Sequence, residues 1–256
     1  MIPMLDPTNL TVFVTGATAG FGAAVCRRFA EAGARVIGTG RRRERLDALK
    51  SELGERCHVA ELDVTDRDAV TALVASLPAG FAAPNVCIAN AGLALGLEPA
   101  QQAQMSNWEQ MIATNVNGLL YTVNALLPGM VARDEGHVVL LGSVAGDYPY
   151  PGGNVYGATK AFVKQFALNL RADLIGKQVR VTNIEPGLAE TEFSLVRFQG
   201  DAAQAAKPYE GLTPMSAEDI AETIFWSCVL PRHLNVNRLQ IMPTMQAFGN
   251  FAVHRR

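Results

Sequence analysis

The chain has 256 residues, of which 49% are hydrophobic and 18% are charged, and its formal net charge is -2. This composition is typical of a globular protein with a sizeable core and excludes a disordered or fibrous chain. The one basic cluster, Arg41, Arg42 and Arg43, is too small for a nucleic-acid surface but suits a phosphate. We therefore expect no nucleic-acid partner.

The sequence also lacks the usual marks of export and membrane insertion. Residues 1–9 have neither the basic start nor the apolar run of a signal peptide, and no window reaches the roughly 18 uninterrupted apolar residues of a membrane span. The four cysteines lie far apart and form no Cys-x-x-Cys pair, at Cys26, Cys57, Cys87 and Cys228. We expect a soluble, cytoplasmic protein with reduced cysteines, no metal site and no membrane partner.

Short apolar segments alternate with segments of helical periodicity through most of the chain. Several of the short segments are nearly continuous apolar runs, which is typical of parallel strands that are covered on both faces. The predicted strands are residues 10–15, 35–40, 58–62, 85–90, 138–142 and 179–185.

Several helix ends can be predicted from capping residues. Gly33 and Gly54 stand where a helix end favours a left-handed residue, and a long helix is predicted over residues 154–176. Three helix starts are predicted where a capping residue precedes a carboxylate by three positions, in the pairs Thr65 and Asp68, Ser106 and Glu109, and Ser216 and Asp219. The alternation predicts an α/β fold: a single Rossmann-type, doubly wound parallel sheet with helices on both faces.

No internal repeat and no linker interrupts this pattern, so residues 1–256 are predicted to form one domain. Residues 194–213 are an exception to the periodicity. They are polar and contain Gly200, Pro208 and Gly211. Long segments without periodicity inside a compact domain are often functional loops, so this one is predicted to be a loop or a lid.

The first predicted strand runs directly into a glycine-rich turn, Thr15-Gly16-Ala17-Thr18-Ala19-Gly20-Phe21-Gly22, which opens a helix. Glycine permits positive φ there and lets backbone N–H groups approach a pyrophosphate at the helix N-terminus. The G-x-x-x-G-x-G spacing differs from the G-x-G-x-x-G fingerprint, and alone it can be a tight turn without a ligand. Its place after the first strand of an alternating chain favours a dinucleotide site.

The end of the second predicted strand indicates which dinucleotide binds. Folds that bind NAD usually place a carboxylate about 20 residues after the glycines, on the ribose 2'-hydroxyl. Residues 34–43 contain no acidic residue, and the strand ends in Gly40-Arg41-Arg42. A guanidinium can pair with a 2'-phosphate, so NADP is favoured. The alternative is that these arginines only solvate a helix start.

Four polar residues are candidates for catalysis. Tyr156 and Lys160 are four apart in a predicted helix, so their side chains share one face. Such a pair is a weak signal by itself. Ser143 lies at the end of the fifth predicted strand, the edge where open α/β sheets bind ligands. Asn115 follows the fourth strand and has no obvious role in the core.

Taken together, these motifs resemble the short-chain dehydrogenase/reductase family. They occur in the family's order from residue 10 to about residue 191, and one departure is Ala89, where the family often has an asparagine. The matching residues are Thr15-Gly16-x-x-x-Gly20-x-Gly22, Asp63-Val64, Asn90-Ala91-Gly92, Asn115, Ser143, Tyr156-x-x-x-Lys160, Pro186-Gly187 and Thr191. The resemblance implies one dinucleotide-binding oxidoreductase domain that acts on CH–OH groups.

The resemblance also implies a role for each catalytic candidate. Tyr156 is the general acid/base, Lys160 lowers its pKa and holds the nicotinamide ribose, and Ser143 polarises the substrate oxygen. Asn115 helps to carry protons through water to Lys160. A free phenol has a pKa of about 10, so nearby positive charge must lower that pKa before the phenol can accept a proton near neutral pH.

The implied cofactor-binding set spans most of the chain. Asp63 and Val64 flank the adenine, Asn90 and Gly92 lie at the adenine ribose, and Thr191 holds the carboxamide or pyrophosphate side. The full predicted set is Gly16, Thr18, Gly20, Phe21, Gly22, Arg41, Arg42, Asp63, Val64, Asn90, Gly92, Tyr156, Lys160, Pro186, Gly187 and Thr191.

Longer stretches resemble a bacterial subgroup of this family, the 3-hydroxy acid dehydrogenases. These stretches are residues 16–22, 39–42, 92–96, 152–162, 191–194 and 196–198. The resemblance implies NADP-dependent oxidation of serine, allo-threonine or 3-hydroxypropionate, or reduction of malonic semialdehyde, by a homotetramer. The apolar tail 248–251 can seal an interface between subunits. The chain departs from subgroup members in being one residue shorter between Gly187 and Thr191.

Two other functions remain open on the sequence. A reductase of other carbonyls, such as sulfoacetaldehyde or apolar ketones, could use a pocket lined by Leu93, Leu95, Tyr148, Tyr150 and Phe193. A catalytically idle NADP-binding sensor is the other, although binding alone needs no acid/base tyrosine.

The predicted substrate contacts are Ser143, Tyr156 and Arg197. A 3-hydroxy acid carries a negative charge beside the reacting carbon, and enclosing that charge without a partner is costly. Arg197 is the only arginine of residues 194–213, and its planar fork matches a carboxylate. Lys207 is the other cation available, and a solvated surface arginine is the alternative interpretation of Arg197.

Overall fold

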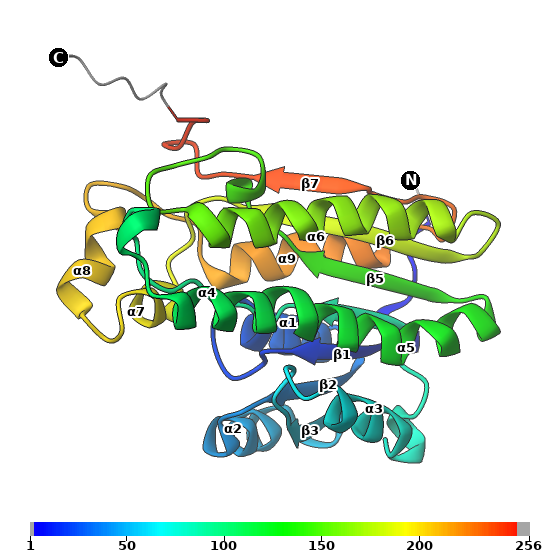
Figure 1. Cartoon of the computed structure of the whole chain (residues 1–256). Helices are drawn as coiled ribbons and strands as arrows, with labels where there is room; N and C mark the ends of the chain where they lie inside the picture. The colour runs from blue at the N-terminus through cyan, green and yellow to red at the C-terminus, as the bar shows by residue number, and fades with distance from the viewer. Residues whose placement is uncertain (1–2, 250–256) are drawn as a thin grey trace, which may run out of the picture.

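The chain folds around a seven-stranded sheet whose strands are all parallel, and the computed structural model describes residues 3–249 (Figure 1). The strands are ordered β3-β2-β1-β4-β5-β6-β7, so the strand order reverses between β1 and β4. Their bounds are β1 Thr11–Thr15, β2 Arg35–Gly40, β3 Cys57–Glu61, β4 Val86–Ala89, β5 Gly136–Leu141, β6 Val179–Pro186 and β7 Arg238–Ile241.

Helices cover both faces of this sheet. Buried side chains of α1, α2 and α9 share one core cluster with the sheet, and those of α3, α5 and α6 share another. The helices are α1 Gly20–Glu31, α2 Arg43–Leu53, α3 Arg67–Ala75, α4 Met105–Ile112, α5 Leu119–Arg133, α6 Asn154–Asp173, α7 Glu192–Arg197, α8 Ala202–Ala206 and α9 Ala217–Val229, with a π-helical turn, Ala113–Gly118, between α4 and α5.

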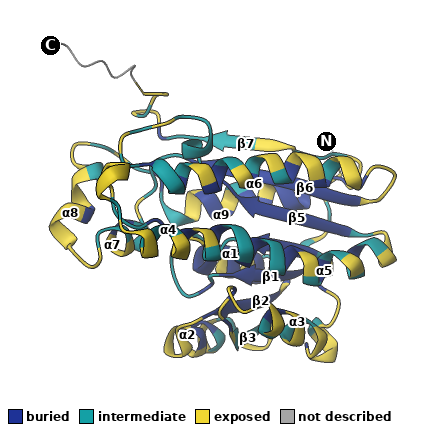
Figure 2. Cartoon of the chain, in the orientation of Figure 1, coloured by how far each residue is buried: buried dark blue, intermediate teal, exposed yellow. Residues whose placement is uncertain are grey.

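The alternation of side chains along each strand explains these two cores. In β1, Val12 and Val14 belong to the cluster under α1 and α9, whereas Phe13 between them belongs to the cluster under α5 and α6. All five residues of β1 are buried. This agrees with its continuous apolar run, which predicted a strand covered on both faces. Figure 2 shows the same pattern, with buried strands between helices that are exposed on their outer sides.

The predicted fold class is confirmed, and all six predicted strands form within two residues of their expected bounds. The capping box of Ser216 and Asp219 is present, and Gly33 and Gly54 have positive φ. The seventh strand, β7, was not predicted.

Two of the three predicted helix starts are wrong in detail. Asp66, not Thr65, caps α3, because its carboxylate accepts a hydrogen bond from the Ala69 N–H. Helix α4 begins at Met105 after Gln104, one residue before the predicted cap Ser106, and has no side-chain cap.

The segment predicted as a loop or lid holds short helices. Helix α7 ends inside residues 194–213, and α8 and the 3-10 turn Lys207–Tyr209 follow it. Helices of five or six residues are too short to show a helical period in the sequence, which is why they were missed.

Within residues 3–249, no helix is long and apolar enough to cross a membrane. The same part of the chain contains no group of three or more His, Cys, Asp or Glu side chains that could hold a metal ion.

Candidate functional site

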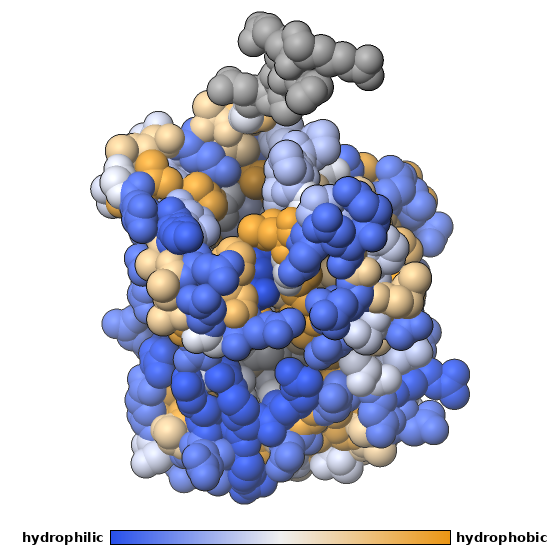
Figure 3. Space-filling model, turned by 60° about the vertical axis from the view of Figure 1, so that its left-hand side comes forward, coloured by the Kyte–Doolittle hydropathy of each residue, from blue (hydrophilic) through white to orange (hydrophobic). Residues whose placement is uncertain are grey.

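A cleft of about 370 Å³ opens at the carboxyl edge of the sheet, where the strand order reverses between β1 and β4. Helix α1 leaves β1 toward one face and α5 follows β4 on the other, so a crevice forms between them. Figure 3 brings this edge forward and shows hydrophobic residues in a hollow between hydrophilic rims. The predicted residues that line the cleft are Gly16, Thr18, Gly20, Phe21, Arg41, Arg42, Asp63, Val64, Asn90, Gly92, Ser143, Tyr156, Lys160, Pro186, Gly187 and Thr191.

The glycine-rich turn after β1 forms one wall. Gly16 and Gly20 have positive φ angles of 70° and 50°, which residues with a side chain rarely adopt. Gly22 does not line the cleft, but a Cβ there would lie 2.3 Å from the carbonyl oxygen of Gly16. Gly22 therefore lets α1 pack closely on the turn. The N-cap of α1, Ala19, gives no side-chain hydrogen bond, so the first N–H groups of α1 are available to an anion.

Asn90 holds this turn from the neighbouring strand. Its Nδ2 donates to the carbonyl oxygen of Thr15 at 2.8 Å and to that of Gly16 at 3.4 Å. The Thr15 hydroxyl accepts from the backbone N–H groups of Asn90 and Ala91, both at 3.0 Å. Asn90 lines the cleft, but its side-chain amide fixes the turn.

The two predicted phosphate-binding arginines lie at the far end of the cleft. Arg42 donates from Nε and NH2 to the Thr18 hydroxyl, at 3.2 and 3.1 Å, and from NH1 to Glu192 at 2.8 Å. Arg45 donates to the same Glu192 carboxylate at 2.8 Å. Hydrogen bonding by Arg42 lowers the pKa of Glu192. Glu192, the first residue of α7, was not predicted, because its partners are about 150 residues away in the chain.

The part of the cleft that is predicted to bind adenine is formed by the residues after β3. Val64 is buried, and a Cβ on Gly118 would lie 2.6 Å from its Cγ2, so the π-helical turn passes directly over it. Asp63 accepts from the backbone N–H and hydroxyl of Thr65, at 2.9 and 2.8 Å. The Arg41 guanidinium lies 4.0 Å from the Asp63 carboxylate.

The catalytic candidates meet at the inner end. Tyr156 and Lys160 lie on α6 and are only 9% and 7% exposed. Burial raises the pKa of Tyr156 to about 12, and hydrogen bonding by Ser143 opposes that rise. Burial lowers the pKa of Lys160 to about 8, and its Nζ donates to the carbonyl oxygen of Leu141 at 2.7 Å. The Lys160 Nζ lies 5.8 Å from the centre of the Tyr156 ring.

Asn115 lies behind these residues, in the π-helical turn Ala113–Gly118. Its Oδ1 accepts from the Leu93 N–H at 2.8 Å, and its Nδ2 donates to the Leu93 carbonyl at 2.8 Å and to the Thr159 hydroxyl at 3.1 Å. Asn115 is 1% exposed and does not line the cleft. A Cβ built on Gly92 would lie 3.2 Å from Asn115 Oδ1 and 3.5 Å from Lys160 Nζ, which places the two side chains around one glycine.

Arg197, the predicted substrate contact, is the last residue of α7. Its NH2 donates to the Tyr150 hydroxyl at 2.6 Å, and its Nε donates to the carbonyl oxygen of Gly96 at 3.3 Å. Its guanidinium carbon lies 5.4 Å from the centre of the Tyr156 ring. The side chain does not line the cleft, but it stands beside the ring of Tyr156.

The end of β6 and the start of α7 complete the cleft. The Ser143 hydroxyl donates to the Pro186 carbonyl at 3.5 Å. Thr191 caps α7 by accepting from the Phe193 N–H at 3.2 Å, and a Cβ on Gly20 would lie 3.4 Å from the Thr191 Cβ. The segment after β6 thus reaches across to the glycine-rich turn. Further lining residues that were not predicted as cofactor or substrate contacts include Leu62, Thr114, Leu141, Ala189, Glu192 and Val196.

Comparisons with known proteins agree with this geometry. The sequence pattern of the family described as short chain dehydrogenase matches residues 10–201. The chain belongs to the short chain dehydrogenase family. The matched residues include every strand of the sheet except β7, together with Ser143, Tyr156 and Lys160.

Relatives within the short chain dehydrogenase family are similar over nearly their whole length. The chain is 57% identical over 247 residues to NADP-dependent 3-hydroxy acid dehydrogenase YdfG of Salmonella typhi, covering 96% of this chain and 100% of that protein. It is 51% identical over 245 residues to serine 3-dehydrogenase of Agrobacterium fabrum, covering 96% and 98%. A solved structure of the closed form of serine dehydrogenase complexed with NADP+ superposes with a TM-score of 0.95, at 54% identity, over 96% of this chain and 99% of that one.

Proposed function

We propose that the chain is an NADP-dependent oxidoreductase that transfers a hydride between the cofactor and a small 3-hydroxy acid or its semialdehyde. Serine, allo-threonine and 3-hydroxypropionate are the proposed substrates. The observation that carries the proposal is that Ser143 and the buried side chains of Tyr156 and Lys160 meet at the inner end of a cleft whose outer end holds Arg41 and Arg42. The names of the similar dehydrogenases support the same cofactor and substrate class.

The residues of the cleft fit NADP. The uncapped start of α1 and the glycines at 16 and 20 suit a pyrophosphate, and Gly22 supports them by close packing. Arg41 and Arg42 suit the 2'-phosphate. Glu192 pairs with Arg42, but Arg45 pairs with the same carboxylate, so Glu192 does not neutralise Arg42 alone. We assign Asp63 and Val64 to the adenine, Gly92 and Asn90 to its ribose, and the nicotinamide end to the set Tyr156, Lys160, Pro186, Gly187 and Thr191. NADP supplies the carbon centre that takes or gives the hydride.

Tyr156 is the proposed proton donor and acceptor. With a pKa of about 12 it is protonated at neutral pH and is ready to donate a proton to a carbonyl oxygen. In the oxidation direction it must first lose that proton, which the positive charges of Lys160 and Arg197 favour. The Ser143 hydroxyl holds the substrate oxygen, and Asn115 is assigned to the proton path toward Lys160.

Arg197 is the proposed partner of the substrate carboxylate, and residues 194–213 are the proposed lid. The guanidinium stands beside the Tyr156 ring, where a 3-hydroxy acid must place its reacting carbon. The Nε and NH2 groups of Arg197 donate to Gly96 and Tyr150. Its NH1 group makes no hydrogen bond with the described residues. The Tyr150 hydroxyl would then orient the fork rather than bind the substrate.

A reductase of apolar carbonyls is the second candidate. Leu93 and Phe193 line the cleft near the catalytic tyrosine, and the rings of Phe193 and Tyr156 lie 5.6 Å apart. These side chains would suit an apolar substrate, whereas Arg197 beside them would not. The charge of Arg197 is therefore the feature that favours a hydroxy acid.

We further propose that the chain is one catalytic domain that works as a homotetramer in the cytoplasm. Apolar side chains on the outer faces of two helices support association: Ile112 on α4 is 44% exposed, and Phe162 and Leu168 on α6 are each 38% exposed. In the apolar tail, Phe248 packs its ring 4.9 Å from that of Tyr148. Residues 250 and 251 of the tail lie outside the described residues.

The test of this function is an NADPH absorbance assay over a panel of substrates. The panel contains 3-hydroxy acids, malonic semialdehyde, sulfoacetaldehyde and bulky apolar ketones. The proposal expects the highest kcat/KM for the hydroxy acids and the semialdehyde. Turnover of bulky apolar ketones alone would overturn it, and turnover of no compound with intact NADPH binding would favour a sensor.

A further inference from the structure

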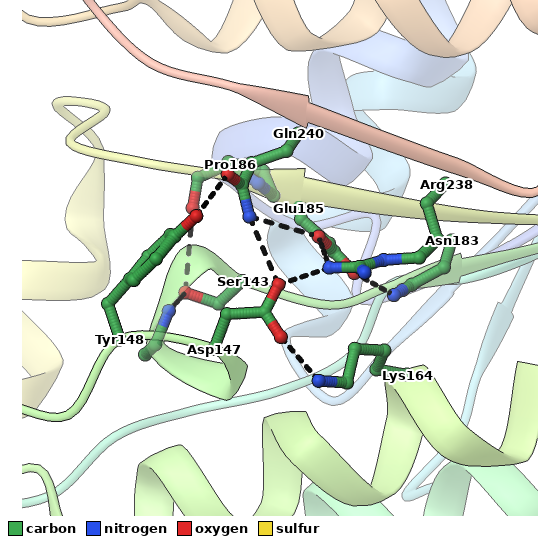
Figure 4. Close-up of polar contacts among 10 residues, drawn as sticks. Ser143, Asp147, Tyr148, Lys164, Asn183, Glu185, Pro186, Arg238 and Gln240 are labelled. Atoms are coloured by element: carbon green, nitrogen blue, oxygen red, sulfur yellow. Dashed lines mark hydrogen bonds and ion pairs between the residues drawn. The ribbon is translucent and has the colours of Figure 1, made fainter. Parts of the chain in front are cut away.

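A group of charged and amide side chains lies beside Ser143 but outside the cleft (Figure 4). Its members come from the turn after β5 and from α6, β6 and β7. The proposed function uses none of them. We call it the Arg238 cluster, and it consists of Asp147, Lys164, Asn183, Glu185, Arg238 and Gln240.

Arg238 is the hub of this cluster. Its Nε and NH2 form a two-pronged pair with the carboxylate of Glu185, at 2.8 and 2.7 Å, and NH2 also donates to Asp147. Glu185 is 1% exposed, so its charge needs this partner. The Nδ2 of Asn183 donates to the same carboxylate at 2.6 Å, and the Nε2 of Gln240 lies 3.2 Å from both acidic groups.

Each carboxylate of the cluster is joined through the backbone to a catalytic element. Asp147 directly follows the 3-10 turn Val144–Gly146, which begins at Ser143. Glu185 directly precedes Pro186, whose carbonyl oxygen accepts from the Ser143 hydroxyl. Asp147 also accepts from Lys164, which lies one helical turn beyond Lys160 on α6.

The turn that carries Ser143 packs on α6 without any intervening side chain. A Cβ on Gly146 would lie 2.8 Å from the backbone carbonyl carbon of Lys160. A Cβ on Gly157 would lie 2.9 Å from the carbonyl oxygen of Ala145. Because backbone meets backbone here, a displacement of the turn moves Ser143 directly relative to Tyr156.

We propose that Arg238 and Asp147 are positioning residues, whose ion pair holds the Ser143 turn against α6 and keeps the Ser143 hydroxyl at the phenol of Tyr156. The ion pair with Lys164 links the Asp147 carboxylate to α6, and the ion pair with Glu185 links Arg238 to β6. The edge strand β7 thus acts on the chemistry through charge, without touching the substrate. This inference rests on the catalytic roles proposed for Ser143 and Tyr156.

The first variant is Asp147→Asn, which removes the charge and keeps the shape. It should lower kcat/KM by about 10- to 100-fold, since a small misplacement of a catalytic group has effects of that size. The Kd of NADPH, measured by fluorescence titration, should stay within about twofold because no member of the cluster lines the cleft. Loss of the Ser143 hydrogen bond should also raise the pKa of Tyr156, so the rise of oxidation kcat/KM with pH should move to higher pH.

A double-mutant cycle with Ser143→Ala separates positioning from general destabilisation. If Asp147 acts through Ser143, Asp147→Asn should have less than about a twofold effect in the Ser143→Ala background. An equal loss in both backgrounds would overturn the proposal. The matched control is Glu135→Gln, which removes an exposed ion pair with Arg232 just before β5 begins, and which should leave kcat/KM and the pH profile unchanged.

The cycle also distinguishes this inference from the proposed function. If Ser143→Ala itself retains full kcat/KM, the catalytic role of Ser143 fails, and the positioning role fails with it. If Ser143→Ala is impaired while Asp147→Asn is not, only the positioning role fails. Should Asp147→Asn not fold, Arg238→Lys is used in the same cycle, because it keeps a charge for Glu185 but cannot bridge both carboxylates as a fork. The same non-additivity is expected, and additivity overturns the inference.

Discussion

The charge of Arg197 can be tested separately from its effect on Tyr156. We consider Arg197→Met, which keeps much of the side-chain length and removes the guanidinium. The variant loses the proposed contact with the substrate carboxylate and the hydrogen bond to Tyr150, which is 2.6 Å long in the protein. It also removes a positive charge 5.4 Å from the Tyr156 ring.

Loss of the carboxylate contact and loss of the positive charge near Tyr156 affect the kinetics differently in the two directions of reaction. A charge-assisted hydrogen bond contributes about 1.5–3 kcal/mol, which corresponds to roughly tenfold to a hundredfold in KM. Removing the Arg197 charge raises the pKa of Tyr156, which burial has already raised to about 12. In the reduction direction at neutral pH the phenol is protonated with or without Arg197. A KM change that is larger for a charged substrate than for an uncharged one therefore reports the carboxylate contact, whereas loss of the contacts with Gly96 and Tyr150 affects both substrates.

The assay is NADPH oxidation at pH 7 with malonic semialdehyde and with an uncharged aldehyde of similar size. The KM for malonic semialdehyde should rise at least tenfold in the variant, while the uncharged aldehyde should change by less than about twofold. Lys207→Gln is the matched control, because Lys207 is the other cation of residues 194–213 and should have no effect on either substrate.

Equal losses for the two aldehydes would refute the reasoning. They would show that Arg197 orders α7 through Gly96 and Tyr150 rather than binding the carboxylate. A selective rise of KM in Lys207→Gln, with none in Arg197→Met, would transfer the role to Lys207.

Three other predictions concern the proton donor, the cofactor and stability. Tyr156→Phe should lower kcat at least about 100-fold and leave the Kd of NADPH unchanged, and a variant that keeps a tenth of kcat would contradict the general acid/base role. The double variant Arg41→Ala, Arg42→Ala should weaken NADPH by roughly tenfold to a hundredfold but NADH little, whereas equal losses would show a structural role. Burial holds the pKa of His137 well below 6.5 in the folded chain, so below pH 6.5 the unfolded chain binds a proton that the folded chain does not. Urea titrations at fixed protein concentration should show the free energy of unfolding falling as pH decreases, by up to about 1.4 kcal/mol per pH unit from this group. The same titrations should show a shallower fall in His137→Gln, and an unchanged slope would contradict the assignment.

The sequence predicts those parts of the fold that depend on local patterns. Nearly continuous apolar runs marked several of the six predicted strands, such as β1, whose residues are buried on both faces of the sheet. Strand β7 was missed because it is a four-residue edge strand with polar Arg238 and Gln240 on it, and nothing local distinguishes it from a loop. The cap of α3 was misplaced by one residue, because Thr65 and Asp66 are both good capping residues and only the fold selects between them.

The site was predictable wherever a motif is contiguous or lies at a strand end. The glycine-rich turn and the Tyr156–Lys160 pair are of this kind. Contacts between distant segments were not predictable. The pairing of Glu192 with Arg42 joins residues 150 apart, and the pairing of Arg238 with Asp147 joins residues 91 apart. A sequence pattern records which residues are present, whereas these contacts depend on how α7 and β7 fold back onto the sheet.

Helix α7 is only six residues long, yet its two ends lie at the sites proposed for two different ligands. Glu192 at its start pairs with Arg42 at the proposed 2'-phosphate end, and Arg197 at its end stands beside Tyr156. If residues 194–213 act as the proposed lid and α7 moves as one rigid piece, both ends of the helix leave the cleft together. Under the proposed function, a bound cofactor and a bound substrate would each have to release α7 before the other could leave.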